Sequence, residues 1–419
     1  MKRKWLAIGI ILLFIGTAII PSNALNNEKS LPASRGHWLY VGGSGPGNYT
    51  KIQDAVENAS DGDTVYVFND SSPYYEHVKI QKSIILLGEN RETTIIDAND
   101  SGSPIILEAN NVIVRGFTIQ NSGYQCYEDA GIYIKNSGGA SDSNKNKIIG
   151  NNIIQNHHGF YGYDSKNNNI SDNVMIGNDH GAIYCDKCDL TIIQNNTITG
   201  NHDGVCIRDS KFVQVNRNTI DDNYEFGVLF EGFSQVSTFH QVKYNSITHH
   251  KFGLTIWSER NIVEYNYIAN NSFGILLRAL GMYGARWNVV QSNIIAYSNT
   301  MGLLLEGATW CKILKNNFIE NTVHATFFYW LPIKMIAPLF GRFLQMNKFY
   351  NNYWDDDNMT SPRVIQGEMI CYVWLSVFLL ILYELHYIHT PPEIEPKYVQ
   401  WKNYDWFPAQ EPYDIPGVR

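Results

Sequence analysis

Cysteine is scarce in this chain, with six residues among 419. Disulfide-stabilised scaffolds are much richer in cysteine, so this protein must rely on a hydrophobic core. The pair in "CDKC", Cys185 and Cys188, has no second C-x-x-C partner elsewhere in the sequence. A structural role for this pair is therefore favoured over a redox pair, half of a metal site or a short-range disulfide.

Positive charge is also in short supply. Lys and Arg number 32 against 40 Asp and Glu, which gives a net charge of -8 at pH 7. The basic residues form no stripe and do not alternate with aromatic residues, so a phosphate backbone would find few groups to neutralise it. Nucleic acid is excluded as an expected partner.

Long hydrophobic runs are limited to two, and both are shorter than the roughly 20 residues of a membrane-spanning helix. The first, Leu6 to Ile20, follows a Lys/Arg cluster and precedes Ser22 and Ala24 at the spacing of a signal-peptidase site. We expect residues 1–24 to be a signal peptide and the mature protein to be extracellular or at the cell surface. An uncleaved N-terminal anchor is the alternative.

The second run, Met369 to Tyr383, lies between Glu368 and Glu384. Its length is marginal for a spanning helix. Residues 357–400 are expected to form an apolar insertion or membrane-associated segment. We expect residues 326–345 and 369–385 to lie together in a membrane surface, with aromatic residues at the headgroup level. A cap that seals the end of the fold is the alternative, and residues 401–419 are expected to close the domain.

The dominant feature of the sequence is an asparagine repeated every 21 to 27 residues. An apolar residue follows each asparagine at the second position, a polar residue, usually Asn, follows at the fifth, and a glycine then opens a short run such as "GVCI" or "GLTI". The aligned positions are Asn151, Asn173, Asn196, Asn218, Asn245, Asn266, Asn293 and Asn316.

This period predicts a solenoid in which each unit buries its apolar face against its neighbours. The β-branched runs indicate strands, and the units are too short for a helix plus a strand. Asparagine suits the corners because its side chain bonds to nearby backbone and tolerates left-handed conformation. We expect these side chains to stack into hydrogen-bonded ladders, as polar amides do in other stacked β structures.

The repeat resembles that of right-handed parallel β-helices of the pectate-lyase-like class, and most closely the NosD-like family. "YVGGSGPGNYTKIQDAVENASDGDTVYVFND" is similar to the N-terminal segment of such proteins, and "NNYWDDD" and "WFPAQEPYDIP" resemble their C-terminal ends. The predicted fold is all-β, a right-handed parallel β-helix over residues 38–356 with three strands in each coil of about 22 residues. "KIQDAVENA" should form a helix that caps the open first coil.

An outward column of side chains is expected at the fourth position after each glycine. It contains Tyr163, Cys185, Arg208, Glu231, Trp257, Arg278 and Glu306. The next residue adds Asp164, Asp186 and Asp209 in three consecutive coils, about 4.8 Å apart. Such a carboxylate line would bind a cation or raise a pKa, and the resemblance to pectate lyases implies calcium. In a hydrolase, two of these carboxylates would serve as acid and base. The alternative is hydrogen bonding at turns.

A second polar cluster precedes the glycines. Two adjacent columns through four coils contain His157 and His158, Asp179 and His180, His202 and Asp203, and Tyr224 and Glu225. Among them, His158, His180 and His202 are the candidate metal ligands. Imidazoles and carboxylates at one level suit copper or zinc. Copper delivery is implied only by the NosD resemblance, and a solvated polar corner is the alternative.

"YGYDSK" at residues 161–166 resembles the start of the Tyr-Gly-Phe-Asp-Pro-His signature of mannuronan epimerases. Ser165 and Lys166 stand where Pro and His are expected, so the proton-transfer pair is incomplete. Lys166 would act as a base only with a strongly lowered pKa, which a surface corner does not provide.

Three functions remain open from the sequence. The favoured one is a non-catalytic surface protein, structural or carbohydrate-binding, in which Tyr163 and Trp257 stack on sugar rings and no cofactor is required. The second is a polysaccharide lyase, epimerase or glycosidase that uses Asp164, Asp186, Asp209, Arg208 and Glu231, with calcium as the optional ion. The third is a metal-handling accessory protein. The fold cannot decide among them, because one scaffold hosts many functions.

Overall fold

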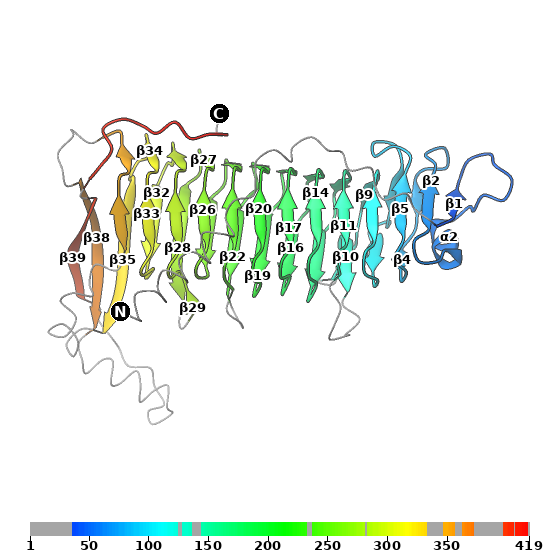
Figure 1. The fold of residues 1–419 in the computed structure, drawn as a ribbon, viewed down its shortest axis with the longest axis horizontal. Helices are drawn as coiled ribbons and strands as arrows, with labels where there is room; N and C mark the ends of the chain where they lie inside the picture. The colour runs from blue at the N-terminus through cyan, green and yellow to red at the C-terminus, as the bar shows by residue number, and fades with distance from the viewer. Residues whose placement is uncertain are drawn as a thin grey trace, which may run out of the picture. The chain divides into compact units, whose positions relative to one another are not determined.

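The computed structural model of the chain describes residues 36–124, 128–135, 144–232, 237–280, 283–332, 347–356, 363–372, 397–405 and 407–417. The predicted signal peptide therefore lies outside the described residues. The described chain is a parallel β-solenoid, and the predicted right-handed parallel β-helix is confirmed. Figure 1 shows the coils side by side along the axis of the stack.

Three strands build each complete coil, and each strand pairs in parallel with its counterpart in the next coil. The long-strand sheet contains β4 (Val78–Ile80), β7 (Ile105–Leu107), β10 (Ala130–Lys135), β13 (His158–Tyr163), β16 (Gly181–Asp186), β19 (Asp203–Arg208), β22 (Phe226–Glu231), β25 (Phe252–Trp257), β28 (Phe273–Leu280), β32 (Met301–Glu306) and β35 (Ala325–Pro332).

The second sheet contains β1 (Trp38–Val41), β2 (Thr64–Val67), β5 (Ile85–Gly88), β8 (Ile113–Arg115), β11 (Lys147–Ile149), β14 (Asn169–Ser171), β17 (Ile192–Gln194), β20 (Gln214–Asn216), β23 (Gln241–Lys243), β26 (Ile262–Glu264), β30 (Val289–Gln291), β33 (Lys312–Leu314) and β36 (Lys348–Tyr350). The third sheet contains β3 (Tyr74–Tyr75), β6 (Ile95–Asp97), β9 (Thr118–Gln120), β12 (Asn152–Ile154), β15 (Val174–Ile176), β18 (Thr197–Thr199), β21 (Thr219–Asp221), β24 (Ser246–Thr248), β27 (Tyr267–Ala269), β31 (Ile294–Ala296), β34 (Asn317–Ile319) and β37 (Tyr353–Trp354).

The core runs through the inside of the coils. Alternate residues of each strand point inward, so β19 buries Val205 and Ile207 completely or almost completely, while Arg208 is partly exposed. Corresponding residues of neighbouring coils stack above one another and form one continuous apolar cluster. Each coil thus completes its core only through its neighbours.

The predicted asparagine ladder is present at the corner between the second and third sheets. Asn196 Nδ2 donates to Asn218 Oδ1 at 3.0 Å and to the Ile170 carbonyl at 2.9 Å, while Asn196 Oδ1 accepts from the Asn173 amide. The ladder ends at Asp405, whose Oδ2 accepts from Asn352 Nδ2 at 3.0 Å. A second ladder follows the fifth-position residues, and His250 replaces asparagine within it.

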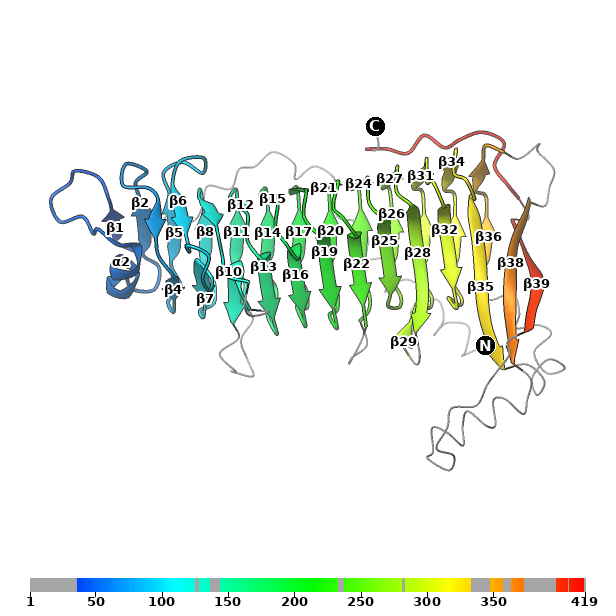
Figure 2. The ribbon, with the colours of Figure 1, turned by 180° about the vertical axis from the view of Figure 1, so that it is seen from behind.

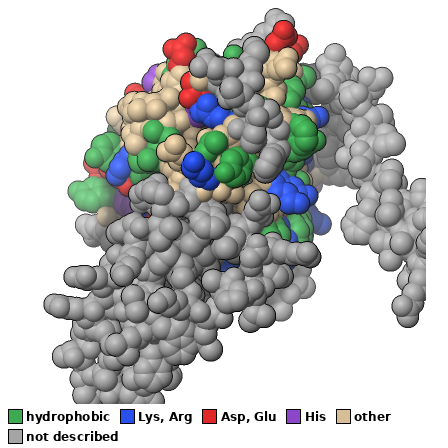
Figure 3. All heavy atoms as spheres, turned by 90° about the vertical axis from the view of Figure 1, so that its left-hand side faces the viewer, with side chains coloured by type: hydrophobic (Ala, Val, Ile, Leu, Met, Phe, Trp, Pro, Cys, Tyr) green, Lys and Arg blue, Asp and Glu red, His purple; other side chains and the backbone are tan. Residues whose placement is uncertain are grey.

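The two ends of the stack are covered differently. Helix α2 (Ile52–Asn58) buries Ile52, Ala55 and Val56 at the first coil, as predicted (Figure 1). At the other end, β38 (Arg363–Tyr372) continues the long-strand sheet beyond β35 and pairs antiparallel with β39 (Lys397–Asp405). Figure 3 looks on this end, where Lys and Arg side chains lie next to hydrophobic ones.

The C-terminal segment runs back along the coils (Figure 2). Asn317 holds it through hydrogen bonds of 2.8 and 2.9 Å to the backbone of Tyr413. Within the expected apolar insertion, residues 363–372 form strand β38. Residues 373–396, which include most of the second apolar run, lie outside the described residues. Within the described ranges, no helix is long and apolar enough to cross a membrane.

One extra residue changes the register of the coil that contains β16. The glycine spacing predicts Gly181 opposite Gly159, but the structure pairs Gly181 with His158 and Ile183 with Phe160. The next coil pairs Asp203 with Gly181, so only this coil is shifted. A second addition, beside β28, forms a short antiparallel hairpin with β29 (Tyr283–Gly284).

Candidate functional site

The outer face of the long-strand sheet holds most of the side chains predicted to be functional. We call the side chains at the ends of its strands the rim column. It contains Tyr163, Asp186, Arg208, Glu231 and Trp257, which pair in consecutive strands, followed by the pair Arg278 and Glu306. Beside it lies a central column formed by Tyr133, Tyr161, Tyr184, Cys206 and Leu229, each 6 to 8% exposed.

The predicted composition of the rim column is wrong at one position. Cys185 is completely buried and points inward, and Asp186 takes its place between Tyr163 and Arg208. The cause is the extra residue in this coil, which moves every later side chain of β16 by one position and hence to the opposite face.

The same shift breaks the predicted line of three carboxylates. Asp164 and Asp209 occupy equivalent corner positions with φ of 46° and 47°, but the residue between them is Lys187, with φ of 58°. Asp186 lies one position earlier, in the rim column. Because a lysine separates the two aspartates, the geometry that suggested calcium is absent.

Charged and aromatic side chains contact one another along the rim column. Arg208 Nε donates to Glu231 Oε2 at 3.0 Å, and its guanidinium lies 5.9 Å from the ring centroid of Tyr184. Arg278 repeats this arrangement with Glu306 at 3.1 Å and the Trp257 ring at 5.8 Å. The column therefore combines aromatic surface with hydrogen-bonding groups in consecutive coils.

Asp186 differs from the other carboxylates of the rim column. Partial burial raises the pKa of its carboxyl group, and Lys187 and Arg208 oppose this increase. Its Oδ1 atom is buried and makes no hydrogen bond within the described part of the chain.

Histidines line the opposite edge of this face. The His158 ring lies 4.6 Å from His180 and 5.4 Å from Tyr161, measured between centroids, and His157 joins the group at 4.8 Å from His158. Burial, reinforced by His180 and His157, lowers the pKa of His158 to about 2. His158 is therefore neutral at physiological pH.

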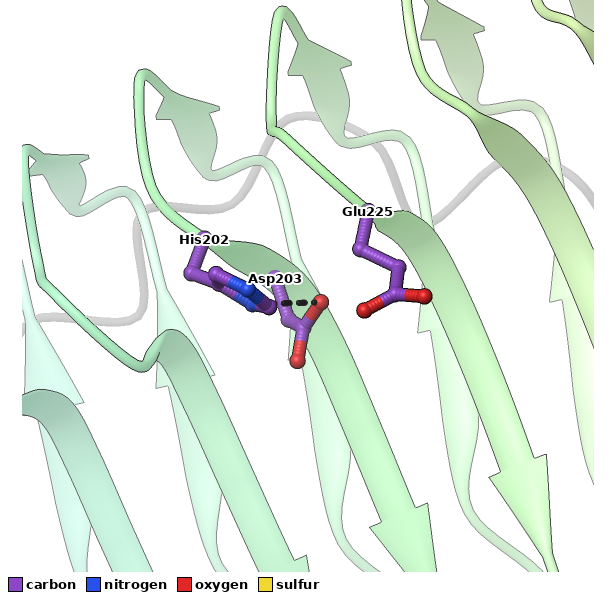
Figure 4. Close-up of side chains that lie close together, drawn as sticks. All are labelled: His202, Asp203 and Glu225. Carbon is purple, nitrogen blue, oxygen red and sulfur yellow. Dashed lines mark ion pairs between the residues drawn. The ribbon is translucent and has the colours of Figure 1, made fainter.

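The predicted trio of His158, His180 and His202 does not form a compact metal site. The three rings lie in a row along the coils and are tilted to one another, and the His180 and His202 centroids are 6.2 Å apart. Among the described residues, ligand atoms instead converge in the group His202, Asp203 and Glu225, all within 4.8 Å of one another. Figure 4 shows the three side chains at the starts of neighbouring strands, on one side of the sheet.

Internal ion pairs already engage this group. His202 Nδ1 lies 3.2 Å from Asp203 Oδ1, the dashed contact in Figure 4, and Glu225 Oε1 lies 3.5 Å from Lys251 Nζ. A nitrogen and two carboxylates suit a divalent first-row metal, because they are borderline and hard donors. The sequence pattern placed His202, Asp203 and Glu225 in one polar cluster, although the predicted ligands were His158, His180 and His202.

A second convergent group lies near the C-terminal end and was not predicted. His324 Nε2 is 2.8 Å from Asp355 Oδ1 and 3.2 Å from Asp356 Oδ1. Arg363 NH2 also contacts Asp356, at 2.9 Å. Arg363 supplies the positive charge beside Asp356, whereas burial lowers the pKa of His324. The contacts of His324 and Arg363 with the two carboxylates therefore link the last coils as a structural network.

The segment that resembles the epimerase signature is divided between two surroundings. Tyr161 is almost buried in the central column, and burial raises the pKa of its hydroxyl. Ser165 is buried against Cys188, with 3.3 Å between Oγ and Sγ, whereas Lys166 lies at an exposed corner, 4.0 Å from Asp189. Nothing in this environment desolvates Lys166 to make it a base.

Comparison with known proteins finds a matching family model and solved structures of similar fold. The family model described as "Periplasmic copper-binding protein (NosD)" matches residues 56–241. No curated protein matches the chain. The Azotobacter vinelandii mannuronan C-5 epimerase AlgE6 A-module aligns with 18% identity and a TM-score of 0.51, over 65% of this chain and 90% of that one.

Two further solved structures are more distant. The AlgE4 A-module, a mannuronan C-5 epimerase of the same organism, aligns with 17% identity and a TM-score of 0.49 over 65% of this chain and 92% of that one. The GH136 lacto-N-biosidase from Eubacterium ramulus aligns with 11% identity and a TM-score of 0.44, over 76% and 64%. At such identities the likeness to AlgE6 concerns the fold alone.

Proposed function

We propose that this chain, a NosD-like right-handed parallel β-helix, is an exported surface protein that binds a polysaccharide along the outer face of its long-strand sheet. The observation that carries the proposal is the rim column, where the rings of Tyr163 and Trp257 flank three charged side chains in consecutive coils. The carbohydrate-active proteins among its structural neighbours are consistent with this function.

The spacing of the coils suits an extended glycan that lies along the axis of the stack. Neighbouring coils are about 4.8 Å apart, which is close to the length of one pyranose ring. Tyr163, 41% exposed, and the partly exposed Trp257 provide apolar surface for sugar C–H groups. Between them, Asp186, Arg208 and Glu231 provide acceptors and donors for hydroxyl groups.

A glycan array with and without calcium tests this proposal. The wild-type protein should retain a defined set of neutral or uronic polymers, and the Tyr163→Ala/Trp257→Ala variant should lose at least tenfold in affinity for them. Tyr75→Ala removes a more exposed aromatic ring from the third sheet and should bind as the wild type does. Absence of retention on the whole array would refute glycan binding.

A uronate lyase or epimerase is the second candidate. His158, Tyr161 and Tyr184 contact one another, and Arg208 lies over Tyr184, where it could neutralise a substrate carboxylate. A lyase would remove the C5 proton, expel the glycosidic oxygen from C4 and leave a C4–C5 double bond. Epimerisation would return the proton to the opposite side of C5.

Catalysis ranks below binding as a candidate function because the residues that would carry it are buried. His158 is completely buried and both tyrosines are 7% exposed, so the substrate could reach them only after side chains moved. Absorbance of unsaturated products, together with exchange of solvent deuterium into the polymer, tests both reactions. Arg208→Ala should abolish any signal, and the absence of both signals with every uronic polymer leaves binding as the function.

Metal handling is the third candidate, and the group His202, Asp203 and Glu225 supports it. Calorimetric titration with Cu²⁺, Zn²⁺ and Ca²⁺ should detect one site that His202→Ala removes. His77→Ala, away from this group, is the control. Asp186→Asn tests the calcium hypothesis in the same assay, and identical heats for this variant and the wild type would reject it.

A further inference from the structure

A second aromatic feature lies at the corner between the long-strand sheet and the second sheet. We call it the corner stack; it comprises Phe212, Phe239, Arg260, Trp287 and Trp310. Their backbones occupy equivalent positions in successive coils. The backbone amide of each of the first four residues donates to the carbonyl of the residue that directly precedes the next member of the stack, for example from Phe212 to Thr238. The four aromatic side chains are 41 to 47% exposed.

The backbone conformation of these residues is unusual for bulky side chains. Their φ angles lie between 53° and 61°, in the left-handed region, where asparagine and glycine are favoured. Asn167 holds the equivalent position in an earlier coil, with φ of 57°. The stack therefore places rings where a smaller residue would be less strained.

The rings of each aromatic pair are stacked in parallel and displaced sideways. Phe212 and Phe239 are 5.2 Å apart with planes 5° from parallel, and Trp287 and Trp310 are 5.3 Å apart with planes at 10°. Atoms in contact are about 3.5 to 4 Å apart, so nearly parallel rings at these centroid distances must be displaced sideways. Each ring thus leaves part of its face open to solvent.

Arg260 joins the two aromatic pairs without adding net charge. Its guanidinium lies 4.5 Å from the Trp287 centroid and 5.9 Å from that of Phe239, and NH1 forms a 2.6 Å ion pair with Glu259. Next to the stack, Gln214 and Gln241 occupy paired outward positions at the starts of β20 and β23. Aromatic faces beside amide groups and a neutralised charge match the apolar face and the hydroxyl groups of a neutral sugar.

We propose that the corner stack is a second glycan-binding surface, separate from the rim column, and that it takes a neutral, extended polysaccharide aligned with the axis of the coils. Its members repeat once per coil, at about the length of a pyranose ring. A membrane with anionic lipids is a poorer partner, because the protein carries a net charge of -8. The same net charge disfavours acidic glycans.

Affinity electrophoresis in hydroxyethylcellulose tests the proposal. The wild-type protein should be retarded, and Trp287→Asn/Trp310→Asn should lose at least tenfold in apparent affinity while keeping the melting temperature, because asparagine suits the left-handed backbone. Tyr297→Asn is the matched control: this ring is 43% exposed, has φ of 53° and lies outside the stack. It should migrate as the wild type does.

Two further arms separate this proposal from the alternatives. Tyr163→Ala/Trp257→Ala should still be retarded by hydroxyethylcellulose, so failure of the rim column leaves the corner stack intact. Lack of wild-type retardation, or equal retardation of the Trp287→Asn/Trp310→Asn variant, would overturn the proposal. The proposal would also be overturned if the only effect of Trp287→Asn/Trp310→Asn were the loss of self-association or of co-sedimentation with phosphatidylcholine vesicles.

Discussion

Single asparagines link neighbouring coils through both their side chains and their backbones. Asn196 receives hydrogen bonds from Asn173 and donates to Asn218 and Ile170, and it is 1% exposed. Removing its amide leaves buried donors and acceptors without partners on two coils. Each such loss costs more than the net value of one hydrogen bond.

Asn196→Ala should therefore lower the free energy of unfolding by about 1 to 3 kcal/mol. Denaturant unfolding of the purified protein measures this change. Thr197→Ala, which alters the adjacent exposed side chain, should stay within about 0.5 kcal/mol of wild type. Equal stability of the Asn196 variant and the wild type would show that the ladder does not contribute.

His250 is the one member of the second ladder whose interactions depend on protonation. Its Nε2 lies 3.1 Å from the amide nitrogen of Asn223, and its Nδ1 lies 3.0 Å from Asn271 Oδ1. Since the Asn223 amide is a donor, Nε2 must accept and stay unprotonated. Burial, the largest effect, lowers the pKa of His250 to about 4.

The sign of the pH dependence follows from this pKa. Between about pH 6.5 and pH 4 the unfolded chain binds a proton at this histidine and the folded chain does not, so stability falls on acidification. At pH 5 the loss from this residue is roughly 2 kcal/mol relative to pH 7. His250→Asn, which restores the ladder residue, should flatten the curve by that amount.

Unfolding curves measured from pH 7 to pH 5 check this prediction. His37→Asn replaces an exposed histidine and should leave the pH dependence unchanged. A His250→Asn variant with the same acid sensitivity as wild type would contradict the assigned hydrogen bonds.

At the scale of elements, helix α2 protects the first coil from solvent and from pairing with other chains. Ile52 and Val56 are buried against β1, β2 and β4. In a solenoid, stability is the sum of unit and interface contributions, so damage at one end acts locally. Loss of the cap should loosen the nearby coils first.

Ile52→Ala should cost about 2 to 5 kcal/mol in the N-terminal coils. Hydrogen exchange should show faster exchange at β2 and β5, with little change at β30 and β33. Glu57→Ala, on the exposed side of the helix, is the control. Uniform loss of protection along the whole stack would show that the coils unfold as a single unit.

The coil that contains β16 shows where sequence reasoning succeeded and where it failed. Asparagine periodicity predicted the coils and ladders because stacked corners demand one residue type at one position. The glycine spacing failed at Gly181, since a corner accepts one extra residue without losing its hydrogen bonds. The alternation of Ile183 and Cys185 as buried residues carried the correct register.

The functional groups were less predictable than the fold. Strand periodicity placed Tyr163, Arg208 and Glu231 in one column, but it did not reveal that Lys187 separates Asp164 from Asp209. The corner stack was missed because its rings lie at left-handed corner residues, where the sequence pattern suggests only turns. Which side chains of neighbouring coils contact one another depends on local insertions, and the repeat length does not show where these insertions lie.

For the whole molecule, the central claim is that a polysaccharide lies along the outer face of the long-strand sheet. Hydroxyl-radical footprinting of the protein with its preferred polymer from the glycan array tests this claim most directly. Binding should protect Tyr163 and Trp257 and leave Tyr75, 66% exposed on the third sheet, unchanged. Full binding of the polymer without protection of Tyr163 and Trp257 would contradict the account.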